Sequence, residues 1–387
     1  MDRERLKYWL ALTRLKGIKK KTLRGALEVF SDPRAIFEDN GEGLTSVNKN
    51  LAEAVKEVAG WEAIDREFDT LEALGASIIT NDDETYPKLL NSTFDPPLLF
   101  YTLGAIEADS INQTASVAIV GTRNPSHYGI RMARQIAEEL ARAGVTVISG
   151  MARGCDSAAH RGALDANGQT IAVLGTGIDI AYPKENRKLY EEIIDTGLIV
   201  SEFAPGTSPL PHNFPIRNRI ISGLSLGVLV VEAPIRSGAM MTARLALDSG
   251  REVFAVPGKI DSLKSAGTNA LIKDGAGLCG KAADILEGLN LTGFTIKEAL
   301  QAGLENEDGP TGKRRKELTK RLQSDFGENV ERVKLIIGEL TRDEPVHIDL
   351  ITSRTGLQVQ TAASLLLEME LKGYVEQQTG KCFLIKG

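Results

Sequence analysis

The sequence predicts an α/β protein: an extended Rossmann-like parallel sheet with a helical N-terminal domain and a C-terminal winged-helix domain. Three observations predict it. Short apolar segments alternate with helical segments through the middle of the chain. Before them, apolar residues recur every three or four positions, and after a polar stretch the chain ends in a helix-turn-helix pattern and a hairpin. At 387 residues, the chain is long enough for two or three domains.

Residues 1–75 form the predicted helical domain. Apolar residues recur at helical spacing in 6–15, 19–30 and 51–74. Between the first two segments lies a turn that contains Gly17 and is followed by Lys19, Lys20 and Lys21. It resembles a helix-hairpin-helix, as in a helix-hairpin-helix or SAM-like domain, whose turn amides can approach a DNA phosphate. The usual second glycine is absent, so a plain helical bundle with a solvated lysine patch is favoured.

Residues 76–288 form the predicted Rossmann-like domain. Two short apolar segments, 76–80 and 96–104, open it. The predicted strands that follow are 116–121, 145–150, 170–175, 198–202, 227–233 and 252–258. The predicted helices lie near 127–143, 157–166, 185–195 and 239–249. Strands that are apolar throughout and alternate with helices indicate a parallel sheet covered on both faces.

Residues 289–328 are polar and rich in both charge signs, which is typical of a linker. Residues 329–387 show the winged-helix order of helix, short helix, longer helix and β-hairpin. The longer helix offers Gln358 and Gln360 but also Glu368 and Glu370, and no arginine in its first turns. Recognition of DNA bases by arginine or lysine of this helix is therefore unsupported. The winged-helix segment could instead be a module that docks to a protein.

Composition and net charge exclude several classes of protein. With 42% hydrophobic and 25% charged residues the chain is an ordinary globular protein, and no segment has the roughly 18 apolar residues of a membrane helix. A cytoplasmic protein is expected. Cys155, Cys279 and Cys382 are far apart, which predicts neither disulfides nor a zinc site, and no cofactor is expected. The net charge of -6 excludes a histone-like binder but leaves room for a local basic groove.

Two predicted loops combine glycine with arginine. Gly121, Thr122 and Arg123 follow the strand 116–121, and Gly150 and Arg153 follow the next strand. In a doubly wound sheet, ligands bind beyond the carboxyl ends of the strands. Backbone amides beside a guanidinium form a phosphate site, so both loops are predicted to bind an anion. The alternative for each arginine is a surface salt bridge.

The third loop begins like a dinucleotide fingerprint with Gly175 and Gly177, but Ile180 stands at the third glycine position. Tyr182 there is a candidate for base stacking, or else a packed plug of the loop. Lys184 and Asn186 on the same loop are further candidate contacts.

A predicted helix start further along carries Arg217, Asn218 and Arg219. On a helix, residues two apart point in different directions. One arginine is therefore expected to bind ligand and the other to pair internally.

No catalytic site is predicted. Residues 275–282 match the spacing of a P-loop, but Ala282 replaces the hydroxyl that holds magnesium. Neither a Gly-x-Ser-x-Gly elbow nor an assignable catalytic triad is present. Glu202 and Glu232 end strands at the expected ligand edge, where carboxylates more often cap helices or orient arginines than act as bases.

Seven motifs taken in order resemble the DNA-processing protein A family (DprA, also called Smf). They are Ala118 to Arg123, Ser149 to Asp156, Leu174 to Asp179, Tyr182-Pro183, Asn213 to Gly223, Ser237 to Ala243 and Ala255 to Gly258. The resemblance covers roughly residues 76–285. It implies a homodimeric, non-enzymatic protein that binds and protects single-stranded DNA and helps to load RecA recombinase during natural transformation. The family's Gly-Ser/Thr-Arg motif falls on Gly121, Thr122 and Arg123, which implies that Arg123 lies in the DNA pocket.

Two other functions are open alternatives. A nucleoside-monophosphate base hydrolase of the lysine-decarboxylase-like Rossmann type would carry a Pro-Gly-Gly-x-Gly-Thr loop followed by glutamate, and residues 238–243 lack both the glycines and the glutamate. A pure scaffold, whose RecA-type partner binds the DNA instead, would not need Arg123.

Overall fold

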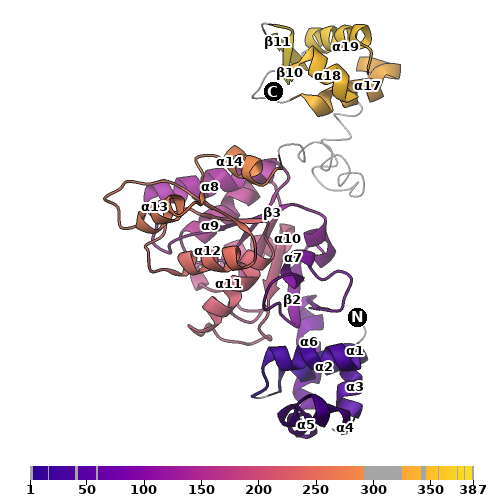
Figure 1. Cartoon of the computed structure of the whole chain (residues 1–387), viewed down its shortest axis with the longest axis vertical. Helices are drawn as coiled ribbons and strands as arrows, with labels where there is room; N and C mark the ends of the chain where they lie inside the picture. Colours follow the sequence, from indigo (N-terminus) through magenta and orange to yellow (C-terminus); the bar gives the residue numbers. More distant parts are fainter. Residues whose placement is uncertain are drawn as a thin grey trace. The chain divides into compact units, whose positions relative to one another are not determined.

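The structure is a computed structural model. It describes residues 3–15, 17–39, 42–57, 60–291, 325–340, 346–355, 357–372, 374–378 and 380–385. Two compact units, Met1–Thr292 and Gly293–Gly387, make up the chain (Figure 1). Most of the predicted linker 289–328 lies outside the described residues.

A nine-stranded sheet organises the first unit, in the order β1-β2-β6-β5-β4-β3-β7-β8-β9. Strand β2 pairs antiparallel with β1 and β6, and the other neighbours are parallel. The strands are β1 (Ser77–Thr80), β2 (Leu99–Gly104), β3 (Ser116–Val120), β4 (Thr146–Ser149), β5 (Thr170–Leu174), β6 (Leu198–Ser201), β7 (Gly227–Val230), β8 (Glu252–Ala255) and β9 (Gly277–Leu278). The predicted parallel sheet is confirmed, and the strand order reverses between β3 and β7, where ligands bind in such sheets.

Helices cover both faces of this sheet. On one face, α8 (His127–Arg142), α9 (Cys155–Asp165) and α14 (Ala282–Gly288) share a core with Ile119 and Leu229. On the other, α11 (Asn213–Gly223), α12 (Gly238–Asp248) and α13 (Ala266–Lys273) share a core with Val120 and Val228. The remaining helices of this region are α7 (Lys88–Asn91) and α10 (Arg187–Thr196).

The N-terminal segment contains α1 (Arg3–Thr13), α2 (Lys20–Phe30), α3 (Pro33–Glu38), α4 (Glu42–Val47), α5 (Lys49–Lys56) and α6 (Trp61–Leu74). The segment 51–74, predicted as helical throughout, is therefore two helices. Gly60 precedes α6 with a φ of 101°, a left-handed conformation that a continuing α-helix does not contain.

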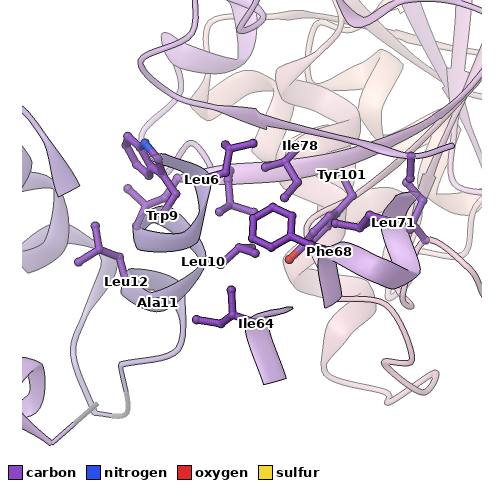
Figure 2. Packing of buried hydrophobic residues seen from close by; sticks show 14 of the residues in the cluster. Leu6, Trp9, Leu10, Ala11, Leu12, Ile64, Phe68, Leu71, Ile78 and Tyr101 are labelled. Atoms are coloured by element: carbon purple, nitrogen blue, oxygen red, sulfur yellow. The ribbon is translucent and has the colours of Figure 1, made fainter. Parts of the chain in front are cut away.

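These helices pack directly on the edge of the sheet. Leu6 and Leu10 of α1 and Phe68 of α6 belong to one buried cluster with Ile78 of β1 and Tyr101 of β2 (Figure 2). The Tyr101 hydroxyl, which is also buried, donates to Glu67 Oε1 at 2.6 Å. The helical segment and the sheet thus form one continuous core.

The second unit has the predicted winged-helix layout. Helices α17 (Val330–Glu339), α18 (Ile348–Thr355) and α19 (Val359–Leu371) enclose a core that includes Val333, Ile351 and Leu366. The antiparallel strands β10 (Val346–His347), β12 (Cys382–Ile385) and β11 (Val375–Gln378) lie in that order.

Within the described residues, no helix is long and apolar enough to cross a membrane, and no cluster of His, Cys, Asp and Glu has the arrangement of a metal site. Cys155 and Cys279 are buried free thiols. Burial raises the pKa of each to about 12, which makes both unreactive at neutral pH.

Candidate nucleic-acid interface

The carboxyl ends of strands β3 to β7 form one edge of the sheet, which we call the rim. Arg123 stands on the loop after β3. The Thr122 amide donates to the Glu232 carbonyl at 2.7 Å, and the Thr122 carbonyl accepts from the Cys155 amide at 3.3 Å. Arg123 itself is exposed and has no ion-pair partner among the residues described. Its guanidinium is therefore available to an anion.

Two glycines allow the loops after β3 and β4 to meet. A Cβ on Gly121 would lie 2.5 Å from Cys155 Sγ, and one on Gly154 would lie 2.5 Å from the Thr122 carbonyl oxygen. Gly154 also has a φ of 84°, which disfavours any other residue. Close packing, more than the exposure of free amides, thus requires glycine here.

Carboxylates occupy the helix starts behind these loops. Glu232 accepts from the Ser126 amide at 2.8 Å and its hydroxyl at 2.6 Å, while Ser126 Oγ caps α8 through the Gly129 amide at 3.1 Å. Asp156, in the first turn of α9, accepts from the Ala152 amide at 3.3 Å. These carboxylates place negative charge beside the positive ends of α8 and α9.

Phe214, which the sequence analysis missed, lies at the centre of the site. Its ring centroid is 5.3 Å from the Arg123 guanidinium carbon, 5.9 Å from that of Arg217 and 5.6 Å from the ring of Tyr182. A Cβ on Gly175 would lie 2.8 Å from the Phe214 ring, so glycine makes the room for it. Its sequence signal was an aromatic residue between a proline-rich loop and two arginines at a helix start.

Arg217 is buried beneath this ring with 3% of its surface exposed. Its Nη1 donates to the carbonyls of Gly150, at 2.6 Å, and Val173, and its Nε donates to Asn218 Oδ1 at 3.2 Å. Burial lowers the pKa of Arg217 to about 10 and raises that of Asp156 to about 6, and the attraction between the two charges opposes both shifts. Arg217 thus carries a positive charge inside the protein.

Arg219 is paired on the other side of α11. Its Nη2 donates to both Glu202 oxygens at 2.7 and 2.5 Å, and its Nε lies 3.4 Å from Asp95 Oδ2. Both arginines have internal partners, while Arg219 Nη1 is buried without a hydrogen-bond partner among the described residues, so the expectation that one of the two binds ligand stays a prediction. The partners of both come from loops and strands distant in sequence, which helical spacing alone does not reveal.

The remaining candidate residues lie on the loop after β5 or contact its neighbours. Lys184 is exposed without an ion pair in the described chain, and Arg153 forms a solvated pair with Glu185 at 2.5 Å. Asn186 Nδ2 donates to the Met151 carbonyl at 2.8 Å and to a serine hydroxyl, which joins this loop to the one after β4. Asn218 Nδ2 similarly donates to the Gly238 carbonyl at 3.4 Å.

The site therefore combines exposed cations with aromatic rings. Arg123 lies over the half-buried Phe214, which contacts the 37% exposed Tyr182, and the exposed Arg153 and Lys184 stand on the loops after β4 and β5. Cations pair with phosphates and aromatic rings stack with bases, so this combination suits a nucleic acid whose bases are unpaired.

Comparison with known proteins identifies the family. The family model described as DNA recombination-mediator protein A matches residues 77–290, and the DprA winged helix domain matches 334–381. Protein Smf of Synechocystis sp. is 34% identical over 96% of this chain and 97% of its own length. Protein Smf of Escherichia coli is 38% identical over 82% of this chain and 80% of its own length.

Two solved structures resemble this chain. DNA processing protein A from Streptococcus pneumoniae has a TM-score of 0.65 at 32% identity, and the match covers 73% of this chain and 97% of that one. DNA processing protein A from Helicobacter pylori, described with its single-stranded DNA binding mode, has a TM-score of 0.51 at 32% identity over 56% of this chain and 96% of that one. The chain belongs to the DNA recombination-mediator protein A (DprA/Smf) family.

Proposed function

We propose that this protein binds single-stranded DNA without sequence preference, protects it, and helps to load RecA recombinase on it during natural transformation. The observation that carries the proposal is the cluster of Arg123, Phe214 and Tyr182, where a free guanidinium lies 5.3 Å from an aromatic ring centroid. The single-stranded DNA binding mode described for the Helicobacter pylori relative supports it.

In this proposal the rim residues divide into two groups. Arg123, Arg153 and Lys184 pair with phosphates, and Phe214 and Tyr182 stack with bases. The second group holds these side chains in place through the hydrogen bonds and close packing described above: Gly121, Thr122, Gly150, Asn186, Arg217, Asn218 and Arg219. Backbone and stacking contacts carry little base information, so binding tolerates any sequence.

The rim carboxylates support a binding protein over the hydrolase alternative. Glu232 accepts from Ser126, Glu202 from Arg219, and Asp179 from the Gly206 amide at 2.8 Å. A general base must be free to accept a proton from its substrate or water. These carboxylates instead accept hydrogen bonds that hold loops and arginines. The proposed binding function needs no cofactor.

The test is a fluorescence-anisotropy titration of labelled oligo-dT at several salt concentrations. Arg123→Ala is expected to weaken binding and to lower the log-log salt slope by roughly 0.7, the value for one lost phosphate contact. Arg142→Ala is the control, because Arg142 is also an exposed arginine and lies in the last turn of α8, where it pairs with Glu138. Equal binding by both variants, or displacement of the oligonucleotide by a mononucleotide alone, would contradict the proposal and reopen the hydrolase or the scaffold.

We also propose that the protein acts as a homodimer through the end of the sheet at β8 and β9. In the loop after β8, Ile260 is 98% and Leu263 84% exposed, and β9 is an edge strand. Large exposed apolar side chains beside a strand edge are typical of an interface. Leu263→Asp is expected to give a monomer in analytical ultracentrifugation, and an unchanged mass would contradict this interface.

A further inference from the structure

Helix α2 begins in a lysine cluster, Lys19, Lys20 and Lys21. Lys20 is the first helical residue, no side chain caps the helix start, and its first turn contains no acidic residue. Lys19 and Lys21 are exposed and have no ion-pair partner in the described part of the chain. Their positive charges add to that of the helix end.

An ion pair fixes this cluster beside the rim. Lys20 Nζ lies 2.5 Å from Glu202 Oε1, and Glu202 directly follows β6 at its carboxyl end. The same carboxylate receives Arg219 from α11. The start of α2 therefore lies at the same edge of the sheet as the Arg123 loop, although the two are distant in sequence.

The surroundings of the ion pair keep a positive excess. Arg24 Nη2 lies 2.8 Å from Asp95 Oδ1, and Arg219 Nε lies 3.4 Å from Asp95 Oδ2. Within the described part of the chain, the three cations Lys20, Arg24 and Arg219 thus form ion pairs with two carboxylates, Glu202 and Asp95. The unpaired Lys19 and Lys21 increase this excess, which makes the patch attractive to a polyanion.

Sheet geometry sets the distance between this patch and the Arg123 loop. In the strand order, β6 is separated from β3 by β5 and β4. Three strand spacings correspond to about 14 Å. The loop after β5, which carries Tyr182 and the exposed Lys184, lies between the two. The span is larger than one nucleotide, and one exposed cation and one aromatic ring stand on the loop between its two ends.

We propose that Lys19 and Lys21 form a second phosphate-binding site, which takes the single strand as it continues past β5 and β6 from the Arg123 and Phe214 surface. The inference rests on the proposed function and extends it to the helical N-terminal segment. Lys20 and Glu202 position the site, because their ion pair holds the start of α2 against the rim. Lys19 and Lys21 supply the phosphate contacts.

The test measures binding of the full chain to two lengths of oligo-dT, about 4 and about 20 nucleotides, lengths that bracket ordinary site sizes for single-strand binding folds. The variant is Lys19→Gln with Lys21→Gln. The matched control is Lys49→Gln with Lys56→Gln, which removes two exposed lysines from α5 in the same helical segment. Circular dichroism confirms that each variant is folded.

The lysine-cluster variant is expected to bind the short oligonucleotide like wild type. With the long one its log-log salt slope should fall by roughly 1.4, about 0.7 for each lost phosphate contact, while the control is unchanged. A wild-type slope with the long oligonucleotide would overturn the inference and leave the proposed function standing. If the lysine-cluster variant loses more affinity for duplex DNA than for single-stranded DNA, the patch binds duplex DNA and the inference is overturned. Wild type that binds neither length would contradict both proposals.

Discussion

At the scale of single residues, the proposed site has exposed side chains that are available to a ligand and buried side chains that hold its loops. Phe214 lies between the exposed Arg123 and the buried Arg217, each guanidinium carbon less than 6 Å from its ring centroid. Both guanidinium groups lie over the half-buried ring, so the part of Phe214 that stays exposed is the apolar surface of the proposed site. A base stacked there would also bring its phosphate to Arg123.

Phe214→Leu tests this platform. Leucine keeps an apolar side chain but removes the ring, so binding of oligo-dT is expected to weaken by about 1–3 kcal/mol, the contribution of one base stacked on an aromatic residue. Phe94→Leu is the control, because Phe94 is 94% exposed and lies on the loop before β2. Anisotropy titration compares the two, and equal affinities would show that no base stacks on Phe214.

His160 provides a prediction on stability. It is fully buried, its Nδ1 lies 2.7 Å from Thr170 Oγ1, and burial together with Arg217 and Arg161 lowers its pKa to about 3. The folded protein therefore keeps it neutral, whereas the unfolded chain binds a proton below pH about 6.5. Its contribution to stability is present above that pH and is lost as the pH falls.

His160→Asn should remove this dependence. Between pH 6.5 and pH 5 the wild type is expected to lose about 2 kcal/mol of unfolding free energy relative to the variant. Asp156, whose raised pKa of about 6 acts in the opposite direction, is present in both proteins and cancels in the difference. Urea unfolding at both pH values measures the difference in unfolding free energy between wild type and variant. A difference that stays constant with pH would contradict a neutral His160 in the folded protein.

At the scale of elements, glycines decide how closely the loops and helices approach. Gly121→Ala would place a methyl group 2.5 Å from Cys155 Sγ, so the loop after β3 or the start of α9 must move. The expected loss of stability is about 1–3 kcal/mol.

Gly25→Ala is the counterpart. Gly25 lies inside α2, and a Cβ there would have no atom within 4 Å, so alanine should stabilise the protein by about 0.5–1 kcal/mol. Chemical denaturation measures the change in unfolding free energy of each variant, and opposite signs would confirm both predictions.

Periodicity predicted the regular elements well because their burial repeats along the chain. The parallel strands β3 to β8 and the helices between them lie within a few residues of the predicted segments. Strand β9 has only two residues, both exposed, and the break at Gly60 depends on one dihedral angle. Neither leaves a periodic signal.

The candidate site was predictable only in part. Arg123 could be predicted as a candidate because a glycine and a strand end mark it locally. The internal roles of Arg217 and Arg219 depend on Gly150, Val173 and Glu202, which come from three other strand ends. Only the fold brings these partners together.

At the scale of the whole molecule, the two units have separate cores. Among the described residues, the three clusters of the first unit end at Leu291, and the cluster of the second begins at Phe326. The first unit carries every rim residue of the proposed site. The second presents a helix α19 with Glu368 and Glu370 and without arginine.

A chain that ends after Thr292 is therefore expected to fold on its own and to bind oligo-dT with the affinity of the full chain, within about twofold. Separate cores also predict that the full chain unfolds in two steps, because cooperativity extends only as far as shared packing. Calorimetry of both chains tests the folding, and anisotropy in low salt tests the binding. A folded, truncated chain that binds markedly more weakly would show that residues 293–387 contact the DNA, in spite of the acidic residues on α19.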